Sequence, residues 1–366
     1  MRHKYRNLII VTFLFFLTIN AIPNVLGATR QSYLTNFILS NEIVGNGYSN
    51  GVEGGNRVSF EATAYALDIL MNYYIFPQDI ETLQNNLELN IRDMFDSGVV
   101  DLYDLYFMLK SLDLLGHTID AVLSNRIYKF INDTEQISGG FSFSNTSKSA
   151  NLASTYYVIQ IFALMNKPVE NIPLHKNWVL SCNNSDGGYG GNQSLTSTYI
   201  DTCFAAFILD DDRFGNINDL ADVNKTLTYL KSFYVENSAD LNNYGGYLPD
   251  EIAEYALLSS TYYCVKAIYL IDPTHLNTIP TTSWILKRQN FQDGGFVENT
   301  DGSQETESSV ISCYFAFETL RILNTLSYLA SEIWRVEFNY VILGVVLGSI
   351  GLLIAATVFL WRRRRI

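Results

Sequence analysis

The stretch WILKRQNFQDGGF, residues 284–296, has a counterpart about a hundred residues upstream in WVLSCNNSDGGY, residues 178–189. In both, a tryptophan is followed by an apolar pair, and later by Asp-Gly-Gly and an aromatic residue. The first glycine comes ten residues after Trp284 and nine residues after Trp178. A phrase that recurs in one chain at this spacing indicates a repeated supersecondary unit.

Four Gly-Gly pairs mark the repeat, at 139–140, 187–188, 245–246 and 294–295, with intervals of 48, 58 and 49 residues. An amphipathic stretch precedes each pair, and a longer apolar stretch follows it. Apolar residues recur at three- and four-residue intervals, which is typical of helices. The unit is predicted to be helix, turn, helix, with glycine in the left-handed conformation at the end of the leading helix.

Two weaker copies lie upstream, so the chain is predicted to hold six leading and six following helices. The following helices are apolar on nearly every side, as in TCFAAFIL at 202–209, and such helices are buried. The leading helices mix charged and amide residues into one face. The predicted fold is therefore all-α, an (α/α)6 toroid of six outer and six inner helices. An open solenoid of the same helices is the alternative, but it would not need such apolar inner helices.

The two ends of the chain are predicted to lie outside the toroid. A basic start, MRHKYRN, is followed by an apolar run and by small residues near Gly27 and Ala28, as in a signal peptide. Residues 340–361 carry no charge and are long enough to cross a bilayer, and the arginines that follow favour the cytoplasmic side. The last inner helix is expected to run on toward this span. The predicted segments are a signal peptide (1–27), the toroid (28–332), a juxtamembrane segment (333–339), a transmembrane helix (340–361) and a cytoplasmic tail (362–366).

This organisation predicts a single-pass type I protein of the cell membrane, with its folded domain outside the cytoplasm. Seven basic residues lie in the two terminal segments, so the rest of the chain has 17 Lys and Arg and 37 Asp and Glu. Its formal charge is therefore 17 − 37 = −20. Such a surface repels nucleic acid, which is therefore not expected as a partner. Five Asn-x-Ser/Thr triplets are candidate glycosylation sites in the exported region. They are Asn132, Asn145, Asn183, Asn192 and Asn224.

The order Trp-apolar-Leu, then Gln or Asn, then Asp-Gly-Gly-Phe/Tyr resembles the repeat of prenyltransferase β subunits and of squalene and terpenoid cyclases. The resemblance covers nearly all of residues 30–329 and implies a toroid with a central cavity. Relatives that bind isoprenoids place aromatic side chains in this cavity. The tyrosines predicted to line it here are Tyr156, Tyr199, Tyr262 and Tyr314, although tyrosines at helical spacing also serve as core residues.

The stretch STYIDTCFAAF places Asp201 and Cys203 two residues apart. Protein prenyltransferase β subunits carry a similar Asp-x-Cys-aromatic motif whose two residues ligate zinc, so the resemblance implies a zinc site here. The family's third ligand is a histidine, and no histidine stands at the corresponding places, which hold Ser259, Ser260 and Ile311. Zinc is therefore a possible cofactor with a missing third ligand, and no cofactor is required.

A structural interpretation of the same residues is the alternative. Asp201 could cap its helix, and Cys203 could be a small apolar filler, with Cys313 at the equivalent position. The redox state of Cys182, Cys203, Cys264 and Cys313 is left open, since an exported protein favours disulfides whereas deep helix positions favour free thiols.

Basic residues that would bind an isoprenoid diphosphate are missing as well. No Lys or Arg occurs from Asn177 through Asp212, where the family places them. The favoured function is therefore a membrane-anchored toroid that binds a hydrophobic small molecule, or a peptide or protein, in its cavity without prenyl transfer. The alternative is a diverged enzyme of the superfamily that uses Asp201 and Cys203 in a metal site.

Overall fold

The computed structural model describes residues 24–51, 57–299 and 307–337, together with Gly348 and Arg363. These residues belong to two compact units. One is a ring of helices over 31–328, and the other holds the chain before and after the ring.

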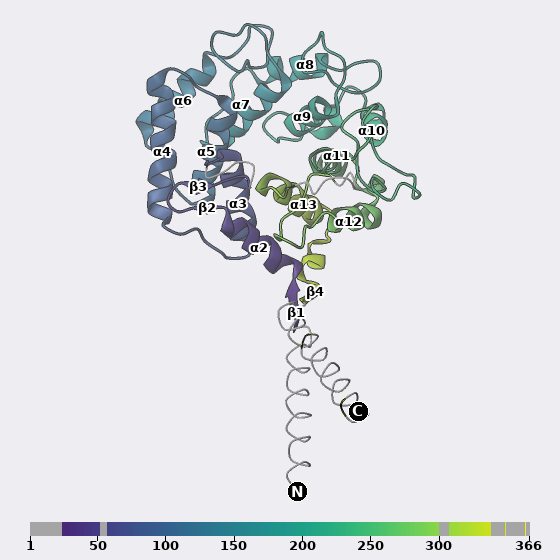
Figure 1. Ribbon diagram of the computed structural model, residues 1–366. Coiled ribbons are helices and arrows are strands. Elements are labelled where there is room, and N and C mark those ends of the chain that lie inside the picture. Colours follow the sequence, from purple (N-terminus) through teal and green to yellow (C-terminus); the bar gives the residue numbers. More distant parts are fainter. Residues whose placement is uncertain (1–23, 52–56, 300–306, 338–347, 349–362, 364–366) are drawn as a thin grey trace. The chain divides into compact units, whose positions relative to one another are not determined.

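Twelve α-helices in the described residues alternate between an outer and an inner position (Figure 1), so the predicted toroid of six helix pairs is confirmed. The outer helices are α2 (Arg30–Ser40), α4 (Ile80–Ser97), α6 (Ala121–Asn132), α8 (Ile172–Ser181), α10 (Val223–Lys231) and α12 (Thr278–Leu286). The inner helices are α3 (Phe60–Asn72), α5 (Leu102–Leu114), α7 (Leu152–Leu164), α9 (Tyr199–Leu209), α11 (Leu258–Ile271) and α13 (Val310–Ile322). Short elements complete the ring: β2 (Glu42–Ile43), β3 (Gly47–Tyr48), η2 (Ile217–Asp219) and η3 (Pro273–His275).

The ring is closed. Each inner helix packs against the next, and α13 packs against α3. At this junction the backbone N–H of Val310 donates to the carbonyl of Asn50 at 2.9 Å. The rings of Tyr65 and Tyr314 stack with their centroids 3.7 Å apart and 5° between their planes. An open solenoid is therefore excluded.

The repeated tryptophans cover the Gly-Gly pair of the preceding unit. A Cβ atom added to Gly246 would lie 2.5 Å from the Trp284 ring, and one added to Gly140 would lie 2.6 Å from the Trp178 ring. Any side chain there would push the outer helix away, since real Cβ atoms do not approach so closely. The glycine pairs at 187–188 and 294–295 lie instead against Tyr229 of α10 and Phe37 of α2, so the feature that recurs is a bare glycine backbone against the next outer helix.

The left-handed glycine is confirmed, but its predicted place was wrong. Gly294 has φ +96°, and a Cβ there would lie 2.4 Å from the Tyr33 carbonyl of α2. The outer helix α12 ends at Leu286, eight residues earlier, so the glycine belongs to the turn between helices. Its role is close approach to the next outer helix as well as backbone freedom.

One hydrogen bond recurs in five units of the described ring. The aromatic residue after the turn donates its backbone N–H to the side chain of the fourth residue of the inner helix. The pairs are Tyr48–Thr63, Phe141–Thr155, Tyr189–Thr202, Tyr247–Thr261 and Phe296–Cys313, at 2.9–3.2 Å. Cys313 therefore corresponds to Thr202, and its predicted equivalence to Cys203 is wrong by one residue.

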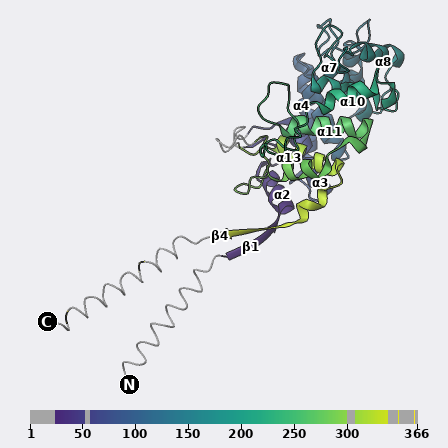
Figure 2. The same ribbon diagram turned by 90° about the vertical axis from the view of Figure 1, so that its right-hand side faces the viewer.

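In the second unit, β1 (Asn24–Thr29) pairs antiparallel with β4 (Glu332–Glu337), as Figure 2 shows. Six residue pairs join these strands. If the predicted signal peptide were cleaved between Gly27 and Ala28, two of the six pairs would remain. The predicted juxtamembrane segment, 333–339, thus lies mostly in β4. The last inner helix does not run on as expected, because α13 ends at Ile322 and the 3-10 helix η4 (Leu326–Ala330) follows.

The predicted membrane segments lie almost wholly outside the described residues, which begin at Asn24 and, between 338 and 362, include only Gly348. Within the described residues, no helix combines the length and the apolar character needed to cross a membrane.

Candidate functional site

The sixth residue of every inner helix is aromatic, and together the six rings form a layer across the centre of the toroid. They are Tyr65, Phe107, Tyr157, Phe204, Tyr263 and Phe315. Neighbouring ring centroids lie 5.2–6.5 Å apart all the way round. Aromatic pairs attract at such spacings. This aromatic layer separates the N-terminal ends of the inner helices from the space on their C-terminal side.

A cavity of about 460 Å³ lies on the C-terminal side of the aromatic layer. Its walls come from the fifth and ninth residues of the inner helices, and its mouth from residues near their C-terminal ends, such as Asp113, Ala163 and Arg321. The mouth of the site thus lies at the ends of the inner helices opposite to the end that holds Asp201, the third residue of α9.

Three of the four predicted tyrosines line this cavity. Tyr156, Tyr262 and Tyr314 are each the fifth residue of an inner helix, and Tyr106 joins them from α5. Tyr199 is not among the lining residues. It is the first residue of α9, lies 6.2 Å from the ring of Phe233, and lines a separate surface pocket.

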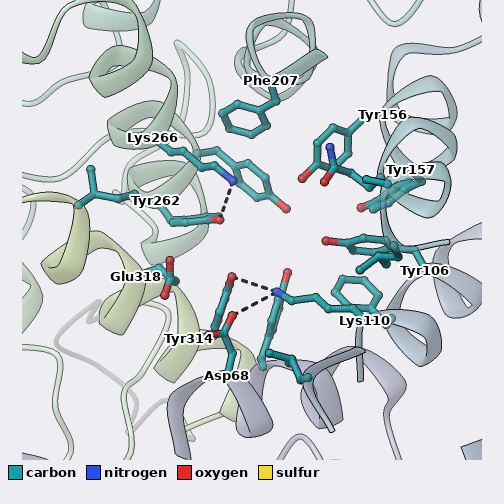
Figure 3. A pocket seen from close by; sticks show the side chains of 18 of the residues that line it. Asp68, Tyr106, Lys110, Tyr156, Tyr157, Phe207, Tyr262, Lys266, Tyr314 and Glu318 are labelled. Atoms are coloured by element: carbon teal, nitrogen blue, oxygen red, sulfur yellow. Dashed lines mark hydrogen bonds and ion pairs between the residues drawn. The ribbon is translucent and has the colours of Figure 1, made fainter. Parts of the chain in front are cut away.

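The cavity is more polar than the sequence predicted. The hydroxyl groups of Tyr106, Tyr156, Tyr157 and Tyr262 point toward its centre (Figure 3). The aromatic layer and the tyrosine rings supply apolar surface, while the hydroxyls supply hydrogen-bond donors and acceptors. The cavity therefore suits an amphiphilic ligand better than a plain hydrocarbon.

Charged side chains occupy the ninth position of four inner helices and face this space. The six residues at that position are Asp68, Lys110, Gln160, Phe207, Lys266 and Glu318. These residues were not predicted from the sequence, although a signal for them was present. Tyr106-Lys110, Tyr156-Gln160, Tyr262-Lys266 and Tyr314-Glu318 repeat a tyrosine and a polar residue four positions apart, on one face of a helix.

The two lysines have different partners. The Lys110 ammonium lies 3.3 Å from the Asp68 carboxylate and 3.3 Å from the Tyr314 hydroxyl, and burial lowers its pKa. The Lys266 ammonium lies 3.4 Å from the Tyr262 hydroxyl and 4.6 Å from the centre of the Phe207 ring. In the described part of the chain, no carboxylate lies within 4.0 Å of Lys266.

Glu318 is 4% exposed and has one satisfied oxygen. Its Oε2 accepts a hydrogen bond from Arg321 at 2.6 Å, while its Oε1 has no partner among the described residues. Burial raises the pKa of the Glu318 carboxyl, and the Arg321 guanidinium offsets part of this effect. A buried polar atom without a partner is uncommon in proteins and indicates strain, a missing water or a ligand.

Within the described residues, Asp201 and Cys203 have no third side chain that could complete a metal site. Asp201 accepts a hydrogen bond from the Thr198 hydroxyl at 2.7 Å, whereas Cys203 is fully buried beside Cys264. Residues two apart on a helix do not face each other. Burial raises the pKa of both groups, which disfavours the thiolate that zinc requires. Among residues the structure describes, no three His, Cys, Asp or Glu side chains could share an ion, so the donor set does not fit zinc.

The four cysteines are free and buried, so the structure holds them as thiols. They are Cys182, Cys203, Cys264 and Cys313.

The candidate glycosylation sites differ in access. Asn145 and Asn224 are exposed, whereas Asn132, Asn183 and Asn192 are half-buried. The Asn183 amide donates to the carbonyls of Gly187 and Gly188 at 3.3 and 3.1 Å. A glycan on Asn183 would compete with these bonds, so Asn145 and Asn224 are the better candidates.

Comparisons with known proteins agree with this architecture. The prenyltransferase alpha-alpha toroid domain matches residues 77–239 and 240–338. No curated protein matches the chain.

Solved structures share the fold at low identity. Candida albicans protein geranylgeranyltransferase-I, complexed with GGPP, is 16% identical with a TM-score of 0.56, covering 77% of this chain and 90% of that one. The type II terpene cyclase MstE from Scytonema is 12% identical with a TM-score of 0.53, covering 82% and 97%. A protein from Actinoplanes is 13% identical with a TM-score of 0.51, covering 82% and 99%. The family match spans well over half of the sequence, and this chain therefore belongs to the prenyltransferase alpha-alpha toroid domain family.

Proposed function

We propose that this protein is a membrane-anchored binding domain that takes a small organic molecule into its central cavity and does not transfer prenyl groups. The observation that carries the proposal is the tyrosine-walled cavity of about 460 Å³, with the aromatic layer at its base. Small-molecule sites are typically concave, about 300–1,000 Å³ in volume, and lined by apolar rings with a few polar groups. This volume favours a small molecule over a folded partner.

Prenyl transfer has little support from the residues present. The motif that would bind zinc contributes a capped aspartate and a buried thiol. The segment from Asn177 through Asp212 holds no Lys or Arg to pair with a diphosphate. The alternative of a metal-dependent enzyme at Asp201 and Cys203 is therefore less favoured than binding.

Terpene cyclisation has an electrostatic argument against it. Its intermediates are carbocations, and like charges repel strongly where water is scarce. The Lys266 ammonium lines the cavity, and the described residues supply it with no carboxylate within 4.0 Å. It would destabilise a carbocation there, and an uncharged amine would react with the carbocation.

Membrane anchoring is part of the proposal and is supported by sequence. Residues 340–361 carry no charge and are followed by four arginines. If the ring lies outside the cell, protease added to intact cells should digest it. A ring that survives this treatment, but is cleaved after the cells are opened, would place it on the other side.

The binding function can be tested by narrowing the mouth. Ala163 is exposed at the mouth on α7, so Ala163→Trp should obstruct entry without disturbing the core. With the full chain in lipid nanodiscs, we expect this variant to weaken binding of the neutral fluorophore N-phenyl-1-naphthylamine roughly tenfold, a loss of about 1.4 kcal/mol.

Val122→Trp is the matched control, because Val122 is 77% exposed on the outer helix α6. It adds the same indole away from the cavity and reports any partitioning of the probe into lipid. Equal binding by wild type, Ala163→Trp and Val122→Trp would show that the probe does not use the cavity and would contradict the function.

A further inference from the structure

We infer that the ligand of this cavity is a monoanionic organic acid that also carries a hydrogen-bond donor, with its acidic group on Lys266 and its donor on Glu318. The inference rests on the proposed binding function and names the chemistry of its ligand. Two independent features of the cavity wall carry it: a cation without a carboxylate partner and a buried carboxyl oxygen without a donor.

Three cations line the cavity, namely Lys110, Lys266 and Arg321, and two of them are paired with a carboxylate. Lys110 is paired with Asp68 at 3.3 Å, and Arg321 is paired with Glu318 at 2.6 Å. Asp113 is exposed at the mouth, where water screens it. Lys266 is the lining cation for which the described residues supply no carboxylate within 4.0 Å. One free cation matches a ligand with one negative charge, whereas a polyanion would leave most of its charge unpaired.

The surroundings of Lys266 suit a carboxylate on an apolar frame. Its ammonium is held between the face of Phe207 and the hydroxyl of Tyr262, and the hydroxyls of Tyr106 and Tyr156 point into the same space (Figure 3). Phenol hydroxyls and an ammonium all donate hydrogen bonds, and charge-assisted bonds to a carboxylate are the strong ones. The aromatic rings that carry these hydroxyls would contact the organic part of the ligand.

Glu318 supplies the second contact. Figure 3 places its carboxyl group on the same side of the cavity as Tyr262 and Lys266. Its Oε1 is buried and unpaired within the described chain, while Arg321 holds Oε2 and so fixes the orientation of the carboxyl group. A hydroxyl or amino group on the ligand would satisfy Oε1. The two contacts together select an acid that carries a donor over a simple acid.

The probe for the test is 6-hydroxy-2-naphthoate, which has both groups on an aromatic frame, and its methyl ester is the neutral control. With the full chain in nanodiscs, calorimetric titration should show the acid binding wild type at least tenfold more tightly than the ester. Lys266→Met keeps an apolar stem on Phe207 and removes the charge. We expect it to weaken binding of the acid roughly tenfold, because the acid loses a charge-assisted hydrogen bond, and to leave binding of the ester unchanged.

Lys225→Met is the matched control, because this lysine has a side chain that is 62% exposed on α10, outside the cavity lining. It removes the same charge and should leave both affinities unchanged. 2-Naphthoate, which lacks the hydroxyl, should bind wild type more weakly than 6-hydroxy-2-naphthoate, and Glu318→Leu should abolish that difference.

The outcomes separate the inference from the function on which it rests. If wild type binds the acid and the ester equally well, the cavity binds ligands but does not select an anion, and the inference is wrong while the function stands. The same holds if Lys266→Met weakens both probes alike. If neither probe binds and Ala163→Trp leaves N-phenyl-1-naphthylamine binding unchanged, the function fails as well. Comparing the affinities of the acid and the ester in wild type tests anion selection without any variant, so the test stands even if a variant misfolds.

Discussion

The two ends of the inner helices use the same sixfold repeat in opposite ways. At the N-terminal end, the fourth residue is Thr or Cys in five helices, and each makes the same hydrogen bond to a backbone N–H. Toward the C-terminal end, the ninth residue is Asp, Lys, Gln, Phe, Lys and Glu in turn. The repeat is regular where it builds the fold and irregular where it lines the cavity.

Backbone hydrogen bonding explains the difference. In five units the aromatic residue after the turn is buried, and because a buried N–H without a partner is costly, each of these units needs a small acceptor at the fourth position. In the unit of α5, Leu105 occupies that position, and the described turn before it has no buried aromatic residue to satisfy. The ninth residues face open space, where no neighbouring backbone dictates their identity.

The largest expected effect comes from breaking the aromatic layer that divides the two ends. Phe107 is 2% exposed and contacts Tyr65, Tyr103 and Tyr106, so Phe107→Ala should lower the free energy of unfolding by about 3–5 kcal/mol. Urea denaturation of the full chain would measure this. Phe143→Ala, at a residue 47% exposed, is the matched control and should have little effect. Equal losses in the two variants would show that the layer does not stabilise the ring.

An intermediate effect is expected from removing one repeated hydrogen bond at the N-terminal end. Thr202→Val keeps the side-chain shape but leaves the buried N–H of Tyr189 without its acceptor, which should cost about 1–3 kcal/mol of unfolding free energy. Thr228→Val is the control, since this threonine is exposed and its hydroxyl donates to the Asn224 carbonyl of its own helix. If Thr202→Val is as stable as Thr228→Val, the buried N–H does not require an acceptor at the fourth position of the inner helix.

The smallest expected effect, and a pH-dependent one, concerns Glu318 in the cavity. Burial raises the pKa of this carboxyl in the folded state, so the folded protein holds the proton more tightly than the unfolded chain does. Its contribution to stability is therefore present below the unfolded pKa and is lost as pH rises through the folded pKa. Glu318→Gln cannot titrate, so its stability relative to wild type should rise over that range, as thermal unfolding at several pH values would show. If the stability of Glu318→Gln relative to wild type does not change with pH, the raised pKa of Glu318 is contradicted.

Much of the fold could be predicted from the sequence because the repeat encodes local geometry. Recurring glycine pairs, and following helices that are apolar on nearly every side, predict a closed ring of helix pairs, which the structure confirms. The cavity residues were harder to predict because the turns differ in length. Tyr199 was predicted to line the cavity, although Cys203 is the residue of α9 in the register of Tyr156, the fifth residue of its helix.

The sequence by itself determined the repeated unit, its turns and the burial of the inner helices, because each depends on residues close together in the chain. Only the tertiary structure decided which side chains meet at the centre. Lys110 and Tyr314 are 204 residues apart and lie within 3.3 Å, a contact that exists only once the ring has closed. The direction of a helical side chain depends on where its helix begins and on the neighbours that the closed ring supplies, and neither is encoded in a local pattern.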